Sequence, residues 1–268
     1  MDIDDRFIDV DFEAEPDYVF GDLGTGLYGD SYGIFEEKYG VLSDAEIDAA
    51  IEANEANGGG GARFVTRIYD QGQEGSCVAN ATCQAIEMVQ ALQYGREHVI
   101  PLSAISLYKR IGRSAQSGAM VSDGLEEAVK NGVLPLDTPE NRQKFGEQVM
   151  PNTGFSRKYP DGWQETASGL VIVEYDIIRS SQGLKTALAL LQPVVVGRQG
   201  HSITYADIIR RSGRYLYPYP NSWRITWGQA YANMEGGFGF DSQSQAQQSA
   251  RWAFTVRSVR VPARGLAA

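Results

Sequence analysis

The chain has 268 residues, of which 43% are hydrophobic and 10% aromatic, and it carries a formal net charge of −10 at pH 7. This composition predicts a globular protein with one large core or two lobes, and no stretch approaches the roughly 20 apolar residues of a membrane span. Two cysteines, Cys77 and Cys83, are too few for a disulfide framework. The acidic N-terminus does not resemble a signal peptide, so we expect a cytoplasmic or virion-associated protein.

The charge is unevenly distributed along the chain. Residues 1–60 hold 17 of the 34 acidic residues and only two basic ones, Arg6 and Lys38, which gives this segment a net charge of −15. The remainder carries a net charge of +5, too small an excess, with no basic cluster among aromatic residues, to indicate nucleic-acid binding. Two interpretations of the acidic segment stay open: a solvated arm, or an arm that docks on the basic body, a protein partner or a large assembly.

In chain order, the first 40 residues lack periodicity and predict loops and short strands. Ser43 and Glu46 form a capping-box pattern that predicts a helix through Ala56, which the glycines at 58–61 end. Because four glycines favour neither helix nor strand, this run predicts a boundary between an N-terminal arm, residues 1–60, and a single domain, residues 61–268.

The rest of the chain predicts helices first and strands later. The predicted helices are Cys77–Tyr94, Ser103–Ile111, Gly124–Lys130 and Leu184–Leu191, and the prolines at 139, 151 and 160 mark a loop-rich stretch. The predicted strands are Arg63–Tyr69, Leu170–Tyr175, Val194–Gly197, Ile203–Ile209, Tyr215–Tyr217, Arg224–Trp227 and Trp252–Val256. This order, without regular alternation, indicates an α+β fold with two lobes.

Cys77 opens the longest predicted helix, and this position favours a reactive thiol. The N–H groups and partial positive charge of a helix N-terminus lower the thiol pKa of about 8.5, and an imidazolium partner lowers it further. Gly75 and Ser76 would let a substrate carbonyl reach the sulfur, and the Gln71 amide could stabilise the oxyanion together with the Cys77 N–H. The alternative is that Cys77 is a small buried hydrophobic residue.

Two later residues complete the pattern. His201 follows a predicted strand and the flexible Gly200, a suitable place for a general base, and Asn221 could fix the tautomer of its ring with Trp223 excluding water. Taken singly, His201 could be a structural histidine and Asn221 a turn residue after a proline. A glycine pattern at residues 24–29 resembles a dinucleotide-binding motif, but acidic neighbours and the absence of a predicted helix argue against that function.

Three blocks resemble the signature segments of papain-like cysteine peptidases: Gln71-Gly72-x-x-Gly75-Ser76-Cys77, Gly200-His201 and Asn221-Ser222-Trp223-x-x-x-Trp227-Gly228. The similarity spans roughly residues 63–240, and Val78–Ala81 is more similar to the bacterial and viral branch than to the plant enzymes. It implies a helical lobe and a β-barrel-like lobe with the cleft between them. It also implies Cys77 as nucleophile, His201 as base and acid, Asn221 as orienting residue and Gln71 as oxyanion donor. The implied cleft residues are Gly75, Ser76, Gly118, Gly200 and Trp223.

The chain departs from the family at four places. Glu74 stands where members usually carry a disulfide cysteine, which is consistent with a reducing compartment, and Val78 replaces the usual tryptophan. Arg224 replaces a glycine near the site. Only seven residues separate Pro193 from His201, fewer than is usual in the family, so one wall of the cleft is expected to be cut back.

The expected function is cysteine-dependent hydrolysis of peptide bonds in a peptide or protein substrate, with no cofactor and no metal. Residues 1–60 lack the helical pattern of the family's inhibitory pro-segment, but a different acidic pro-segment stays open. Two alternatives also stay open. One is a structural or assembly component, such as a phage particle protein, that keeps the peptidase fold with weak or no proteolysis. The other is a hydrolase of cell-wall peptides.

Overall fold

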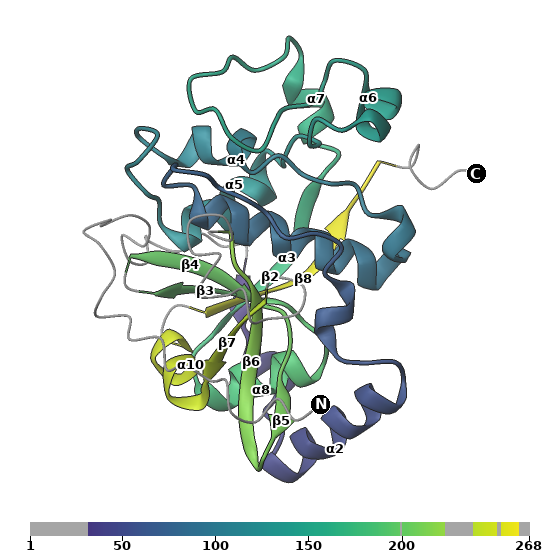
Figure 1. Cartoon of the computed structure of the whole chain (residues 1–268), viewed down its shortest axis with the longest axis vertical. Coiled ribbons are helices and arrows are strands. Elements are labelled where there is room, and N and C mark those ends of the chain that lie inside the picture. Colours follow the sequence, from purple (N-terminus) through teal and green to yellow (C-terminus); the bar gives the residue numbers. More distant parts are fainter. Residues whose placement is uncertain (1–31, 199, 223–237, 251–252, 263–268) are drawn as a thin grey trace.

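The computed structural model describes residues 32–198, 200–222, 238–250 and 253–262. Helices α3 to α7 gather in the upper part of Figure 1, and most strands lie in the lower part with α2, α8 and α10. The helices are α1 (Phe35–Tyr39), α2 (Asp44–Ala56), α3 (Cys77–Tyr94), α4 (Ala104–Ile111), α5 (Val121–Lys130), α6 (Pro139–Phe145), α7 (Trp163–Ala167), α8 (Ser181–Ala189) and α10 (Gln243–Ser249), with short 3-10 helices at Gly61–Phe64 and Arg96–His98. The strands are β1 (Tyr32–Ile34), β2 (Val171–Ile178), β3 (Val194–Arg198), β4 (His201–Tyr205), β5 (Ile209–Arg211), β6 (Arg214–Pro220), β7 (Phe238–Ser242) and β8 (Ala253–Arg260). The predicted α+β architecture is confirmed.

Helix α3 lies between the other helices of the upper part and the strands (Figure 1), and it has the predicted bounds. The C-cap residue Gly95 has a φ of +95°, a backbone conformation that favours glycine and ends the helix. The sequence predicts that one apolar face of α3 is buried, but in the structure every residue from Cys77 to Ala91 is buried. Leu92, expected on the buried face, is 38% exposed.

The other helices of the upper part agree only partly with the predicted bounds. Helix α4 begins one residue after the predicted start, because Ser103 is its N-cap and its hydroxyl accepts a hydrogen bond from the Ser106 N–H. Helix α5 begins at Val121 rather than at Gly124, which lies inside the helix against α3. Helices α6 and α7 fall in the stretch predicted as loop. Pro139 occupies the first turn of α6, where its missing N–H costs nothing.

Two sheets form the strand-rich part. One has the order β1-β2-β8-β3-β4, and the other has the order β5-β6-β7. The predicted strand Ile203–Ile209 is divided into β4 and β5, and Arg224–Trp227 lies outside the described residues. The predicted strand Arg63–Tyr69 is wrong: it begins in a 3-10 helix and then runs extended outside both sheets. Its Tyr69 hydroxyl bonds to Glu87 and to the Leu102 carbonyl instead, which ties the segment to the helical lobe.

Strands β3 and β4 form a tight antiparallel hairpin. Val194 pairs with Tyr205 at one end and Arg198 pairs with His201 at the other, so only residues 199 and 200 remain for the turn. Gly200 has a φ of +78°, as such turns require. The short approach to His201 noted in the sequence is therefore a two-residue connection.

Residues 32–56 pack against the lower lobe. Strand β1 pairs in parallel with Tyr175–Ile177 of β2, and Phe35, Ile47 and Ile51 are buried among residues of α8, β3 and β4. The predicted capping box at the start of α2 is confirmed. The division of the chain at residue 60 stays a prediction, and residues 1–31, which include most of the acidic arm and the glycine pattern, lie outside the described residues.

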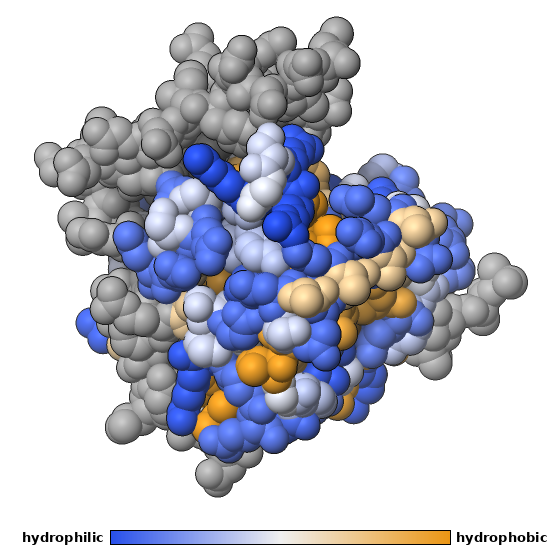
Figure 2. Space-filling view, turned by 90° about the horizontal axis from the view of Figure 1, so that it is seen from below, coloured by the Kyte–Doolittle hydropathy of each residue, from blue (hydrophilic) through white to orange (hydrophobic). Residues whose placement is uncertain are grey.

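The lower face of the molecule is mostly hydrophilic, and its apolar residues form scattered spots (Figure 2). No helix within the described ranges is both long and apolar enough to cross a membrane. Among the same residues, no three His, Cys, Asp or Glu side chains come together as metal ligands would.

Candidate active site

Cys77 is the first residue of α3 and is fully buried. The turn before it is fixed by Asn80, whose amide nitrogen donates to the Ser76 carbonyl at 2.8 Å and to the Ser76 hydroxyl at 3.0 Å. Ser76 itself is buried. The thiol thus lies at the positive end of the helix, as predicted. The Asn80 side chain, one turn into the helix, stabilises the turn that places it there.

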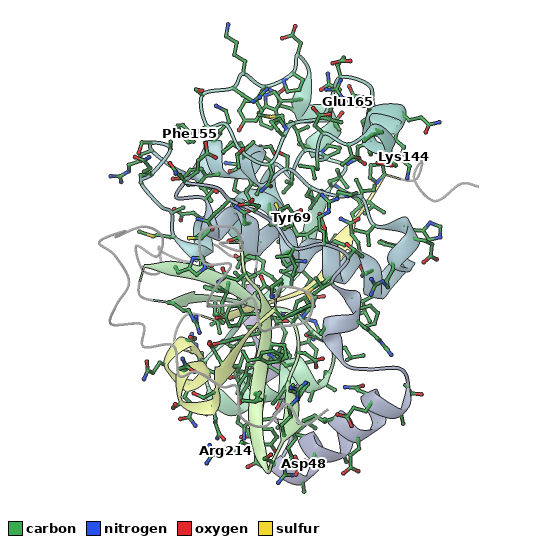
Figure 3. The ribbon with its side chains drawn as sticks, in the orientation of Figure 1. Asp48, Tyr69, Lys144, Phe155, Glu165 and Arg214 are labelled. Carbon is green, nitrogen blue, oxygen red and sulfur yellow. The ribbon has the colours of Figure 1, made fainter. Side chains whose placement is uncertain are left out.

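The second cysteine lies in a different environment. Burial and the nearby Glu87 carboxylate raise the pKa of the Cys83 thiol well above its ordinary value, so this thiol stays protonated. Burial also raises the pKa of Glu87 to about 7, although Arg67, Tyr69 and Leu102 favour its charged form. Tyr69 lies in the middle of the molecule (Figure 3). Of the two cysteines, only Cys77 has a setting that suits a nucleophile.

Gln71 connects the helical side of the site to the strand side. Its N–H donates to the Ser222 carbonyl at 2.9 Å, and its side-chain oxygen accepts a hydrogen bond from the Ser222 hydroxyl. Its side-chain nitrogen donates to the Glu74 carbonyl at 2.8 Å. An amide nitrogen has two hydrogens, so the second can be donated elsewhere.

His201 and Asn221 form a direct contact. His201 Nε2 lies 3.2 Å from Asn221 Oδ1, and both side chains are almost fully buried. Because an amide oxygen only accepts hydrogen bonds, the contact places the proton on Nε2 and leaves Nδ1 as the basic nitrogen. The structure thus brings the His201 ring and the Asn221 amide together, and the orienting role of Asn221 stays a prediction.

The His201 ring is neutral at pH 7. Burial lowers the pKa of His201 to about 3, the Arg198 guanidinium lowers it as well, and the hydrogen bond with Asn221 opposes both effects. Arg198 pairs with His201 across the hairpin, and residues directly opposite in such a pair lie on the same face. The Arg198 guanidinium forms an ion pair with Asp241 of β7 and lies 5.1 Å from the centre of the Tyr219 ring.

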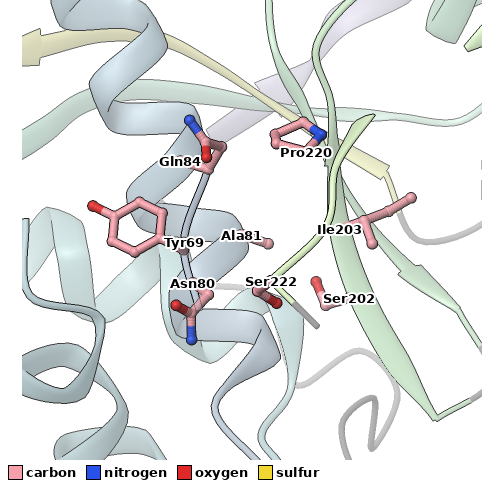
Figure 4. Close-up of a pocket in the computed structure, with 8 residues that line it drawn as sticks. All are labelled: Tyr69, Asn80, Ala81, Gln84, Ser202, Ile203, Pro220 and Ser222. Atoms are coloured by element: carbon pink, nitrogen blue, oxygen red, sulfur yellow. The ribbon is translucent and has the colours of Figure 1, made fainter. Parts of the chain in front are cut away.

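The elements that carry Cys77, His201 and Asn221 meet around a small cavity of about 10 Å³ (Figure 4). Asn80, Ala81 and Gln84 of α3 line one side of it, and Ser202, Ile203, Pro220 and Ser222 line the other, with Tyr69. Next to it, the Thr204 hydroxyl of β4 donates to the Ala81 carbonyl of α3 at 2.6 Å. The volume is about that of one water molecule, so helix and strands are closely packed here.

The expected cleft residues lie in different settings. A Cβ atom on Gly75 would come within 2.9 Å of the Gly118 nitrogen, so glycine is needed where these two loops touch. Gly200 lies in the β3–β4 turn, and Trp223 lies outside the described residues. Sequence reasoning did not identify the roles of Ser222, Arg198 or Asp241. Only the position of Ser222, next to Asn221, could have suggested its contact with Gln71.

Comparison with known proteins identifies the fold. No protein-family model and no curated protein sequence matches the chain. Among solved structures, it is similar to xylellain, a cysteine protease from Xylella fastidiosa, with a TM-score of 0.61 and 19% identity over 91% of this chain and 97% of that one. A digestive procathepsin L 3 of Tenebrio molitor gives a TM-score of 0.55 and 17% identity over 72% of this chain and 67% of that one.

A recombinant stem bromelain precursor gives a TM-score of 0.54 and 16% identity over 87% of this chain and 78% of its own. These structures are papain-like cysteine proteases. The chain therefore has the papain-like two-lobed fold, and the expectation of that fold is confirmed. Its assignment to a bacterial or viral branch stays a prediction.

Proposed function

We propose that the chain is a papain-like cysteine peptidase in which Cys77 is the nucleophile and His201 the base. Asn221 orients the imidazole, and Gln71 donates to the oxyanion. The observation that supports this most is the 3.2 Å contact between His201 Nε2 and Asn221 Oδ1, because it gives the imidazole the tautomer of a general base. A buried structural histidine also needs a hydrogen-bond partner, so the further support is that β4, which carries His201, packs against α3, which begins with Cys77.

The reaction begins as the Cys77 thiol gives its proton to His201 Nδ1 and the sulfur attacks the carbonyl carbon of the peptide. The neutral state of the buried imidazole suits this step, since only the neutral ring accepts a proton. The carbonyl oxygen gains a negative charge, which the second Gln71 side-chain N–H and the Cys77 backbone N–H stabilise.

The C–N bond then breaks, and His201 returns its proton to the leaving amine. Water attacks the acyl-enzyme with His201 again acting as base, so the acid is released and the Cys77 thiol is restored. The substrate is a peptide or protein. Hydrolysis of the peptides of a bacterial cell wall would require the same four residues.

The test is the pH dependence of Cys77 alkylation, measured in a Cys83→Ala variant that keeps one thiol. An ordinary thiol with a pKa of about 8.5 is only about 0.3% thiolate at pH 6. We expect alkylation at pH 6 to be at least about 10-fold faster than that fraction allows, because the neutral His201 ring accepts the thiol proton as the sulfur attacks, and we expect His201→Ala to abolish the excess. The same protein should cleave a fluorogenic peptide library, and Cys77→Ala should not.

Alkylation that follows an ordinary thiol in both proteins, without peptide cleavage, would refute the proposal. That result would favour the second class of function, a structural or assembly component that keeps the peptidase fold.

A further inference from the structure

We propose that the Glu74 carboxylate is a positioning residue that holds the Gln71 side chain in place, an inference that rests on the proposed peptidase function. Glu74 occupies the position at which the resemblance places a disulfide cysteine, but neither cysteine of this chain forms a disulfide. The segment before the nucleophile therefore has to be held by other interactions.

The Glu74 backbone contacts Gln71 directly. Its carbonyl accepts the hydrogen bond from the Gln71 side-chain nitrogen at 2.8 Å, and its N–H donates to the Gln71 carbonyl at 3.3 Å. The direction of the Gln71 amide thus depends on where the peptide unit after Glu74 lies. A shift of that unit would move the oxyanion donor.

The Glu74 side chain fixes that peptide unit to the helical lobe. Its carboxylate accepts hydrogen bonds from the Gly154 N–H at 3.0 Å and from the Phe155 N–H at 2.8 Å. Gly154 has a φ of +109°, a conformation that suits glycine and turns both N–H groups toward the same acceptor. Phe155 lies in the upper, helical part of the molecule (Figure 3). Hydrogen bonds to a charged acceptor are roughly twice as strong as neutral ones.

The same loop also holds the other end of the segment. The Asn152 side-chain nitrogen donates to the Asp70 carbonyl at 2.6 Å and to Asn80 Oδ1 at 3.1 Å, and its oxygen accepts from the Ala104 N–H at 3.2 Å. Residues 152–155 therefore hold both Asp70 and Glu74, which lie on either side of residues 71–73. These contacts hold the segment without a covalent bond, so the arrangement does not depend on oxidising conditions.

The arrangement predicts that Glu74 acts on catalysis through Gln71. In Glu74→Ala we expect kcat to fall at least 10-fold with KM within about threefold, since a misplaced donor weakens transition-state binding more than substrate binding. Glu74→Gln keeps one acceptor oxygen and should lose less. Gln73→Ala is the matched control, because Gln73 is exposed in the same loop.

The decisive measurement is a double-mutant cycle. Gln71→Ala should lower kcat by about 10²–10³-fold, the loss typical of an oxyanion donor. Adding Glu74→Ala to Gln71→Ala should then change kcat by less than about threefold, because the group it positions is already absent. If the losses of kcat in the two single variants multiply in the double variant, the inference is overturned. Slower Cys77 alkylation in Glu74→Ala would also overturn it, because Glu74 would then act on the nucleophile rather than on Gln71.

Hydrogen exchange tests the holding contacts without relying on turnover. In Glu74→Ala the backbone amides of residues 74 and 75 should exchange at least 10-fold faster than in the wild type, while the amides in the middle of α3 keep their wild-type rates. Unchanged exchange at these two amides would overturn the inference. A wild-type chain that binds no peptide and has an ordinary Cys77 thiol would instead overturn the proposed function, so the two failures are distinguishable.

Discussion

Phe35 gives the clearest test of whether residues 32–56 belong to the folded domain. Its side chain is fully buried in a cluster with Ile47, Ile51 and Leu184. Truncating a buried phenylalanine to alanine costs about 3–5 kcal/mol, the sum of lost transfer free energy and the cavity left behind. For a chain of this size, that cost corresponds to a melting temperature lower by roughly 6–20 °C.

The assay is reversible denaturant unfolding of Phe35→Ala followed by circular dichroism, with thermal unfolding as a second measurement. The matched control is Glu37→Ala, because Glu37 is exposed in the same helix and should change stability by less than about 0.5 kcal/mol. If Phe35→Ala lies within about 1 kcal/mol of wild type, then residues 32–56 are a peripheral arm and the reasoning is refuted.

Polar contacts also indicate that residues 32–56 belong to the folded domain, and they predict the effect of truncating the chain. Glu36 accepts hydrogen bonds from the N–H groups of Arg179 and Ser180 and from the Ser180 hydroxyl, and Lys185 forms an ion pair with Asp44. We therefore expect a chain without residues 1–31 to fold, and a chain without residues 1–60 to lose its cooperative unfolding transition. Peptide turnover before and after removal of residues 1–31 then tests whether this part of the acidic arm inhibits the site, and unchanged rates would exclude inhibition by residues 1–31.

Three further predictions concern the neighbourhood of the site. Burial raises the pKa of Glu87 from 4.5 to about 7, so the folded chain keeps a proton that the unfolded chain releases, and stability is lost as the pH rises through this window. The unfolding free energy of Glu87→Gln should therefore fall less between pH 5 and pH 8 than that of the wild type, by up to about 3 kcal/mol. An unchanged pH dependence would contradict the raised pKa of Glu87. Gly75→Ala should abolish peptide turnover, because its Cβ would lie 2.9 Å from the Gly118 nitrogen, and wild-type turnover would show that the loops can separate without cost. Thr204→Val should lower the unfolding free energy by about 1 kcal/mol through loss of the hydrogen bond to the Ala81 carbonyl, whereas equal denaturation midpoints would show that this bond adds nothing to stability.

Local signals explain what could be predicted from the sequence. The ends of α2 and α3 were placed correctly because a capping box and a C-terminal glycine specify helix ends through short-range hydrogen bonds. Cys77 and His201 could be named because the chain has only two cysteines and two histidines, and Asn221 could be named from its place after them and next to Ser222 and Trp223. Their order, with the neighbouring glycines, then selects one kind of chemistry.

Long-range contacts explain what could not be predicted. Strand β1 pairs with β2 across more than 140 residues, and no local pattern near Tyr32 specifies that partner. Arg63–Tyr69 has the residue types of a strand, but the hydroxyl of Tyr69 bonds to the helical lobe, and tertiary contacts decided its conformation. The contacts of Glu74 were likewise hidden, because its partners are backbone N–H groups, which every residue except proline carries.

The tight β3–β4 turn links the shape of the site to its chemistry. A longer connection would leave the partner of His201 in the hairpin undetermined, whereas two residues force Arg198 into register with it. A guanidinium beside the ring opposes its protonation, while the ion pair of Arg198 with Asp241 reduces this effect. A base with a lowered pKa accepts a proton less readily but also returns it more readily to a leaving amine. The two-residue connection therefore bears on the proton transfers of the proposed reaction.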